Sequence, residues 1–275
     1  MFIEIIKAIF IGIVQGITEW LPVSSTGHMI IFDEIVNLDV SKDFMEMFRV
    51  VIQFGSILAV LILFWRRLVP FGKGKSENKK TWNLWLKIAI AAIPAAVIGL
   101  LFDEILDKYL YNYITVAITL IVYGIAFIVI ERLQKNKACK INSAEDFKNK
   151  SALQVGAFQL LSLIPGTSRS GSTILGGMCV GVSRTAAAEF SFFLAIPVML
   201  GASALKILKY VMDFGLSFSP TEIAVLIVGT LTAFLVSLIA IKFLMGFVRR
   251  HSFESFGWYR IVLGIAVIGY FVVVN

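Results

Sequence analysis

The sequence predicts an all-α polytopic membrane protein with six transmembrane helices and two re-entrant helical hairpins in an inverted repeat. Of its 275 residues, 58% are hydrophobic and 16% are charged, whereas about a quarter of the residues in a soluble domain are charged. Apolar runs of about 18–20 residues, enough to cross a bilayer, recur between short charged loops. Two further apolar runs are interrupted by Pro, Gly, Ser and Thr.

The first half of the chain, residues 1–131, predicts one broken hairpin and three spans. The hairpin covers residues 1–36 and is interrupted between Pro22 and Gly27. Backbone groups freed at membrane depth need protein or a water-filled cavity around them, so this segment is predicted to re-enter rather than to cross. The spans that follow cover residues 48–65, 86–102 and 112–131.

The second half, residues 151–275, predicts the same order of elements. Its broken hairpin covers residues 151–182, with the interruption from Pro165 to Thr173. The spans that follow cover residues 189–210, 221–245 and 258–275. The whole chain is therefore predicted to form a single integral membrane domain.

The basic residues concentrate in three loops, after the first, third and fifth spans. They are Arg66, Arg67, Lys73, Lys75, Lys79, Lys80, then Arg132, Lys135, Lys137, Lys140, Lys148, Lys150, then Arg249 and Arg250. Loops rich in Lys and Arg stay in the cytoplasm, which predicts that both chain ends are extracytoplasmic. Lys206 and Lys209 are exceptions. The net charge of +7 thus indicates contact with anionic membrane lipid rather than with nucleic acid.

The two broken segments also resemble each other. The stretch from Leu21 to Gly27 aligns with the stretch from Ile164 to Ser170, and Phe48 aligns with Phe190. Three crossings per half invert the second copy. Inverted repeats usually place their binding site where the two broken elements meet.

The first broken segment carries a carboxylate and an amide on one helix face. Gln15 and Glu19 are four residues apart, so their side chains are neighbours on a helix. Together they could hold Mg²⁺ or Ca²⁺ if a substrate supplies the remaining ligands. The alternative is a Glu at a helix end near the membrane interface, next to Trp20 as an anchor.

Directly after this pair, Ser24, Ser25, Thr26, Gly27 and His28 follow one another. One hydroxyl could simply cap the next helix, but capping does not explain three hydroxyls and a histidine. Histidine suits proton transfer near neutral pH. We expect Ser25 to attack or orient a phosphate, with His28 as base or acid and with Ser24 and Thr26 binding phosphate oxygens.

The second broken segment carries a single guanidinium among hydroxyls and glycines. Arg169 could clamp phosphate oxygens through two hydrogen bonds, and the helix that follows would attract the same anion. The alternative is an Arg that snorkels to lipid headgroups. The groups expected around the phosphates are Gly166, Thr167, Ser168, Ser170 and Thr173.

These motifs resemble the two signatures of the undecaprenyl-diphosphate phosphatase, or bacitracin-resistance, family. The first signature, Glu/Gln-x-x-x-Glu followed by Ser-Ser-Thr-Gly-His, matches Gln15 to His28. The second, Pro-Gly-x-Ser-Arg-Ser-x-x-Thr, matches Pro165 to Thr173. The resemblance covers essentially the whole chain. Many members have Glu where this chain has Gln15, which weakens Gln15 as a direct metal ligand.

The resemblance implies an enzyme of the bacterial cytoplasmic membrane that hydrolyses undecaprenyl diphosphate to its monophosphate. This recycles the lipid carrier of peptidoglycan synthesis and gives bacitracin resistance. It also implies a divalent metal and a pocket open to the extracytoplasmic side. By matched position, Glu19 and Gln15 serve the metal and the diphosphate, Ser25 and His28 the displacement, and Arg169 the phosphates.

Other interpretations of these residues stay open. A lipid transporter or flippase could use the same anion-binding groups, because broken helices in inverted repeats are typical of transporters. A membrane phosphatase with paired histidines would have only His28 and His251 to use. The sequence does not decide between a covalent Ser25 intermediate and an activated water, or between a monomer and a homodimer.

Overall fold

The computed structural model describes the chain apart from residues 37, 73, 216–217 and 275, and without the side chains of residues 30, 33–35, 103–104, 107–108 and 274. Lys73, one of the basic loop residues, lies outside this description. The described elements are helical apart from one isolated bridge between Ile141 and Val182. The helices are α1 Phe2–Thr18, α2 Ser25–Ile35, α3 Lys42–Leu63, α4 Trp65–Leu68, α5 Lys75–Leu110, α6 Tyr113–Gln134, η1 Ala144–Asp146, α7 Asn149–Gln159, η2 Leu160–Leu163, α8 Arg169–Cys179, α9 Arg184–Phe214, α10 Pro220–Val248 and α11 Glu254–Val274.

Six of these helices are long and apolar enough to cross a membrane. They are α3, α5, α6, α9, α10 and α11, and they confirm the six predicted spans. Each helix extends beyond the predicted bounds at one end or at both, whereas α3 ends at Leu63, before the predicted end at residue 65. Hydropathy locates the apolar centre of a helix and not its ends. At α3, for example, the side chain of Ser41 accepts a hydrogen bond from Phe44 N, which starts the helix before its apolar part.

Both predicted interruptions are breaks between helices. The chain leaves α1 at Thr18 and starts α2 at Ser25, and it leaves η2 at Leu163 and starts α8 at Arg169. The re-entrant course of these two segments and the inverted repeat remain predictions.

The two breaks end in the same local structure. Ser24 and Ser168 both have φ of 72°, and each side chain accepts a hydrogen bond from a glycine N–H three residues on, at 3.2 Å. The capping geometry pairs Ser24, rather than Ser25, with Ser168, which corrects the sequence alignment by one residue. The alignment matches residue types, whereas the backbone bend shows which positions are equivalent. Gln15 and Gln159 are as far apart in the sequence as Ser24 and Ser168.

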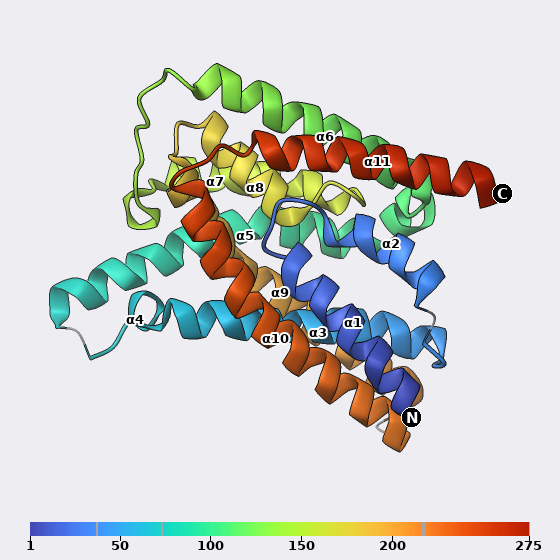
Figure 1. Cartoon of the computed structure of the whole chain (residues 1–275). Coiled ribbons are helices and arrows are strands. Elements are labelled where there is room, and N and C mark those ends of the chain that lie inside the picture. Colours follow the sequence, from blue (N-terminus) through green and yellow to red (C-terminus); the bar gives the residue numbers. More distant parts are fainter. Residues whose placement is uncertain (37, 73, 216–217, 275) are drawn as a thin grey trace.

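Each broken segment packs against a span from the other half of the chain. Helix α1 runs along α10 and α7 packs on α5, while α6 pairs with α11 (Figure 1). The α1–α10 contact is close because both helices carry small residues there: a Cβ on Gly12 would lie 2.7 Å from the carbonyl oxygen of Gly229. A Cβ on Gly124 would likewise lie 2.7 Å from the oxygen of Gly257.

Three of the loops lie at one end of the helices, and both termini lie at the other end. Figure 1 shows both termini and α2 at one end, and the connections α4–α5, α6–α7 and α10–α11 at the other. These three connections are the basic loops of the sequence. His251, in an exposed turn among them, stacks on Phe247 with ring centroids 4.6 Å apart.

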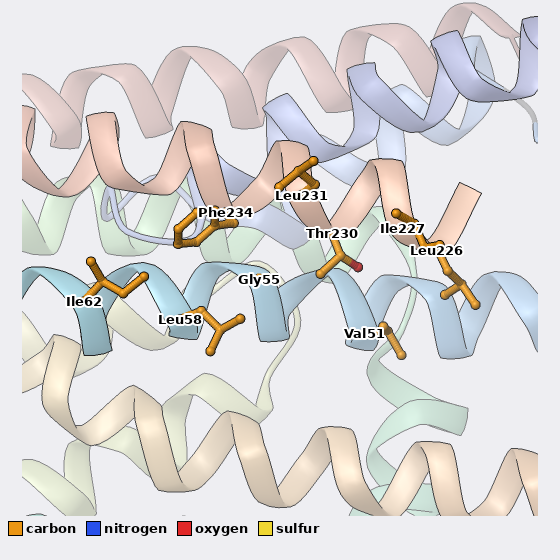
Figure 2. A pocket seen from close by; sticks show the side chains of 9 residues that line it. All are labelled: Val51, Gly55, Leu58, Ile62, Leu226, Ile227, Thr230, Leu231 and Phe234. Atoms are coloured by element: carbon orange, nitrogen blue, oxygen red, sulfur yellow. The ribbon is translucent and has the colours of Figure 1, made fainter. Parts of the chain in front are cut away.

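An apolar groove lies between α3 and α10 (Figure 2). Its volume is about 580 Å³, and all but one of its lining residues are apolar or glycine. The lining residues are Val51, Gly55, Leu58, Ile62, Leu226, Ile227, Thr230, Leu231 and Phe234.

Candidate functional site

The two broken segments meet at an ion pair. Arg169 Nη2 donates to Glu19 Oε1 at 2.7 Å, and the two side chains are 11% and 8% exposed. Glu19 does lie at the end of α1, as its C-cap. Trp20 is not an interfacial anchor, because it is fully buried and its ring centre lies 5.6 Å from the Arg169 guanidinium carbon. The snorkelling interpretation of Arg169 is also wrong, because its guanidinium is paired with Glu19 inside the protein and does not reach out to lipid headgroups.

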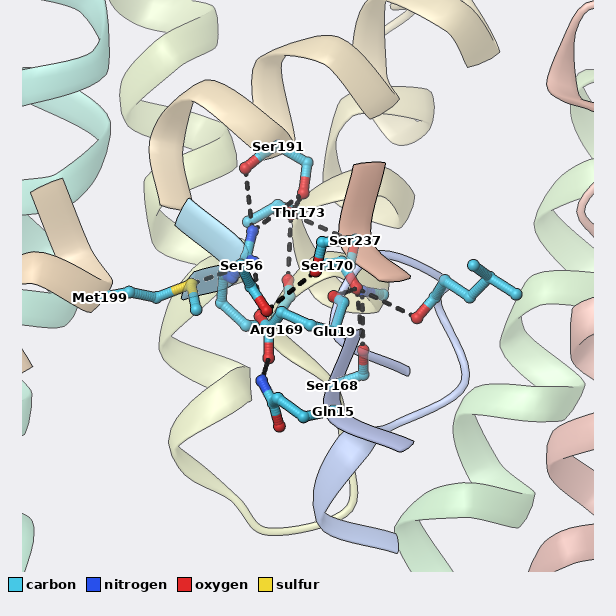
Figure 3. A network of polar contacts seen from close by, with 12 residues as sticks. Gln15, Glu19, Ser56, Ser168, Arg169, Ser170, Thr173, Ser191, Met199 and Ser237 are labelled. Atoms are coloured by element: carbon cyan, nitrogen blue, oxygen red, sulfur yellow. Dashed lines mark hydrogen bonds and ion pairs between the residues drawn. The ribbon is translucent and has the colours of Figure 1, made fainter. Parts of the chain in front are cut away.

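Arg169 has further partners on α9. Its Nη1 donates to the backbone oxygen of Ser191 at 2.9 Å, and its Nη2 lies 3.5 Å from Met199 Sδ. Thr173 Oγ1 donates to Ser191 Oγ at 2.7 Å, on the same side of α9 (Figure 3). The guanidinium is therefore fixed by α1, α8 and α9 together.

Glu19 and Gln15 lie side by side, as their spacing predicts. Gln15 Nε2 donates to Glu19 Oε2 at 3.1 Å, which directs the amide oxygen away from the carboxylate. Among the described residues, no group of three or more His, Cys, Asp or Glu side chains could hold a metal by itself. A Mg²⁺ ion commonly uses one or two carboxylates together with substrate phosphates. For Glu19 and Gln15 to hold such an ion together, the Gln15 amide would have to turn its oxygen toward the ion, and the ion would have to share the carboxylate with Arg169.

Several hydroxyls that we expected to bind phosphate are used inside the protein. Ser170 Oγ donates to the backbone oxygen of Glu19 at 3.2 Å, and so ties the two broken segments together. Ser168 caps α8, Ser24 caps α2, and Thr173 reaches Ser191. Their phosphate-binding roles stay predictions, and what they do in the structure is to hold the two loops in place.

Ser25 and Thr26, by contrast, line a cavity. Its volume is about 430 Å³, and Gln15 also faces it. Ser25 is the first residue of α2, as Arg169 is of α8. The two groups expected to act on a phosphate thus occupy matching positions in the two breaks.

His28 is buried and both of its ring nitrogens have partners. Nδ1 donates to the backbone oxygen of Ser24 at 2.7 Å, so in the neutral ring Nε2 accepts from the hydroxyl of Tyr259, also at 2.7 Å. The structure therefore brings His28 to Tyr259 and not to Ser25. The chain has two histidines, and His251 lies among the basic loops, so a paired-histidine site is wrong.

Arg260 is the residue that our sequence analysis missed. It is fully buried on α11, and its guanidinium donates to the backbone oxygens of Pro22 at 3.2 Å and of Gly166 and Thr167 at 2.9 Å each. It thus binds both interrupted loops at once. The available signal is an arginine within the last predicted span, because a charged side chain in a transmembrane segment is costly and marks a specific role.

Comparison with known proteins identifies the family. The model of the family described as bacitracin resistance protein BacA matches residues 8–266. The chain belongs to this family. It is 58% identical to a protein named undecaprenyl-diphosphatase from Enterococcus faecalis, over 98% of each chain.

Two further relatives carry the same name. The chain is 56% identical to an undecaprenyl-diphosphatase of Acetivibrio thermocellus, over 99% of this chain and 100% of the relative. It is 53% identical to one of Streptococcus thermophilus, over 98% and 93%. Together with the six apolar helices, this makes the protein a multi-pass membrane member of the BacA family.

Proposed function

We propose that the protein hydrolyses undecaprenyl diphosphate to undecaprenyl phosphate and inorganic phosphate. The observation that carries this proposal is the buried Glu19–Arg169 ion pair, which joins the two broken segments in a chain so similar to named diphosphatases. In the reaction a water adds across the phosphoanhydride bond, and each product keeps one phosphate. Charge stabilisation and orientation, rather than difficult covalent chemistry, limit such transfers.

The proposed roles follow the positions of the side chains. Ser25 lines the cavity at the start of α2 and attacks or orients the terminal phosphate. Arg169 lies beside that cavity with its guanidinium on Glu19, and once released from this carboxylate it stabilises negative charge on the phosphate oxygens. His28 exchanges a proton through Tyr259 or after a change of ring orientation, because both ring nitrogens are engaged.

Glu19 and the amide oxygen of Gln15 would hold a Mg²⁺ or Ca²⁺ ion, which would supply electrophilic assistance and reduce the negative charge of the diphosphate. Arg169 neutralises Glu19, which reduces the cost of holding the carboxylate at 8% exposure. Chelation should therefore abolish turnover without unfolding the protein.

The membrane arrangement is part of the proposal. The two halves form an inverted repeat with two re-entrant hairpins, in a bacterial cytoplasmic membrane, and the cavity and both termini face the extracytoplasmic side. The groove between α3 and α10 takes part of the prenyl chain. Gly55 lies in that groove and precedes Ser56. The Ser56 hydroxyl accepts a hydrogen bond from the Ser237 hydroxyl, which also lies next to α1. In a cell this activity would recycle the lipid carrier for envelope synthesis and confer bacitracin resistance.

The test is release of inorganic phosphate from undecaprenyl diphosphate by purified protein in detergent. We expect activity that EDTA abolishes, and a loss of at least about a hundredfold in Glu19→Gln and Arg169→Lys, since one oriented charge contributes about 10²–10³ in rate. Arg132→Ala is the matched control, because Arg132 is 63% exposed and pairs with Glu254 only at 3.7 Å. It should retain wild-type activity.

Two results would contradict the proposal. One is phosphate release that survives both site substitutions in folded protein. The other is translocation of a fluorescent prenyl phosphate in liposomes with no hydrolysis, which would assign the site to a transporter.

A further inference from the structure

The cavity that Ser25 and Thr26 face is lined on its other sides by residues outside the two sequence motifs. These residues come from α3, α9 and the connection before α6, and they are Glu46, Arg49, Val50, Gln53, Tyr111 and Lys206. Arg169 does not line this cavity in the described part of the chain, because its guanidinium is turned to Glu19 and Ser191. The positive charge that faces the cavity therefore comes from Arg49 and Lys206.

The position of these two cations is fixed by contact between α3 and α9. Ser203 is buried and its Oγ donates to the backbone oxygen of Val50 at 3.1 Å. Val50 follows Arg49, and Ser203 precedes Lys206 by three residues, about one helical turn. The bond thus anchors the two helices where the two cations reach the cavity.

Among the residues described as lining the cavity, Glu46 carries the one carboxylate, and it pairs with Lys206. Lys206 Nζ lies 3.8 Å from Glu46 Oε2, with the side chains 35% and 66% exposed. An ion pair this long and this exposed is weak, so Lys206 can turn to a ligand at little cost. Gln53 and Tyr111 add hydrogen-bonding groups to the same wall.

We propose that Arg49 and Lys206 bind the diphosphate of the substrate and set the preference for a diphosphate over a monophosphate. This rests on the proposed function, in which Ser25 acts on the same group. A lipid diphosphate carries more negative charge than its monophosphate product, so two cations in the cavity favour the substrate and let the product leave. Arg49 and Lys206 are substrate-binding residues in the wall of the cavity. Arg169 lies beside the cavity, where Glu19 holds it.

The kinetic test uses Arg49→Gln and Lys206→Gln in detergent micelles. We expect each to raise KM for undecaprenyl diphosphate about tenfold, the effect of losing one charged hydrogen bond, with kcat within about twofold. The inhibition constant of the monophosphate product should rise by a smaller factor than KM for the diphosphate. Lys209→Gln is the control, because Lys209 is exposed on α9 and does not line the cavity.

Glu46→Gln provides a test of opposite sign. Removing this carboxylate should lower KM, since it repels the diphosphate and holds Lys206. A loss of kcat with KM unchanged in Arg49→Gln and Lys206→Gln would overturn the proposal, as would an unchanged KM in both.

A binding measurement separates this proposal from the proposed function. Titration of purified protein with inorganic pyrophosphate by calorimetry should show binding that both cation variants weaken about tenfold, even if the protein releases no phosphate from the lipid. Pyrophosphate binding of equal strength in wild type and both variants, or none in the wild type, would overturn it.

Discussion

At the scale of single residues, the buried charge of Arg260 is bound to the backbone of the two interrupted loops. Arg260 donates to three carbonyl oxygens, one from the first loop and two from the second. A buried cation is tolerated because charge-assisted hydrogen bonds offset its desolvation. Arg260 is therefore a positioning residue: it touches no group expected to react, yet it fixes the loops that carry Glu19 and Arg169.

Arg260→Lys should test this role. Lysine keeps the charge but cannot form the same forked set of bonds, so the loops should lose their relative position. We expect kcat to fall about tenfold or more while the protein stays folded. A kcat equal to that of wild type, with unchanged thermal unfolding, would contradict the role.

The capping serines permit a second residue-scale prediction. Ser24 and Ser168 combine a favourable cap with a positive φ that non-glycine residues rarely adopt. A glycine at either position relieves the backbone strain but loses the cap, whereas an alanine loses the cap and keeps the strain. We expect Ser168→Ala to destabilise the protein by about 1 kcal/mol and Ser168→Gly by less, measured by thermal unfolding in detergent. The reverse order would show that the backbone is unstrained there.

At the scale of elements, small residues decide how closely α1 approaches α10. A Cβ on Gly16 would lie 2.8 Å from the backbone oxygen of Ala233, so a larger residue must push the helices apart. Because Glu19 follows less than one turn later, this packing also positions the carboxylate of the site.

Gly16→Val should therefore cost both stability, by about 1–3 kcal/mol, and phosphate release. The matched control is Gly201→Ala on α9, where an added Cβ meets nothing within 4 Å. This control should keep full activity, with a small gain in stability from better helix propensity. Equal effects of both changes would show that the α1–α10 contact is not close.

A charged cluster links elements at the end where the basic loops lie. Arg67 of α4 pairs with Glu145 of η1 at 2.7 Å and with Glu189 of α9 at 2.8 Å. Burial raises the pKa of Glu145, but hydrogen bonds from Ser143 and Arg67 outweigh it and leave the pKa below its usual value. The folded state thus favours the ionised carboxylate.

This direction predicts a loss of stability in acid. The contribution of Glu145 is present above its unfolded pKa of about 4.3 and is lost as pH falls through the lower folded pKa. Lowering the pH from about 6 to 3 should decrease the unfolding temperature of the wild type more than that of Glu145→Gln. Parallel pH profiles for the two proteins would contradict this.

At the scale of the whole molecule, the arrangement of loops predicts how the chain lies in the membrane. Cys139 and Cys179 are both exposed, and Cys139 lies in the basic loop after α6. By the positive-inside rule, an impermeant maleimide should label Cys139 in inside-out vesicles and not in intact cells. Asp39→Cys, in a background without the native cysteines, should show the opposite pattern. Labelling of Cys139 from outside would reverse the proposed topology.

The membrane class, the six spans, the two breaks and the family can be predicted from the sequence alone, because they follow from hydropathy, turn residues and local motifs. The sequence also brings Glu19 and Gln15 together, since one helical turn fixes their distance. Only the folded chain shows that Glu19 contacts Arg169, that His28 contacts Tyr259, and that Arg260 binds both loops. Such contacts join residues far apart in the chain, and they depend on how whole helices pack. Periodicity along the chain carries no information about that packing.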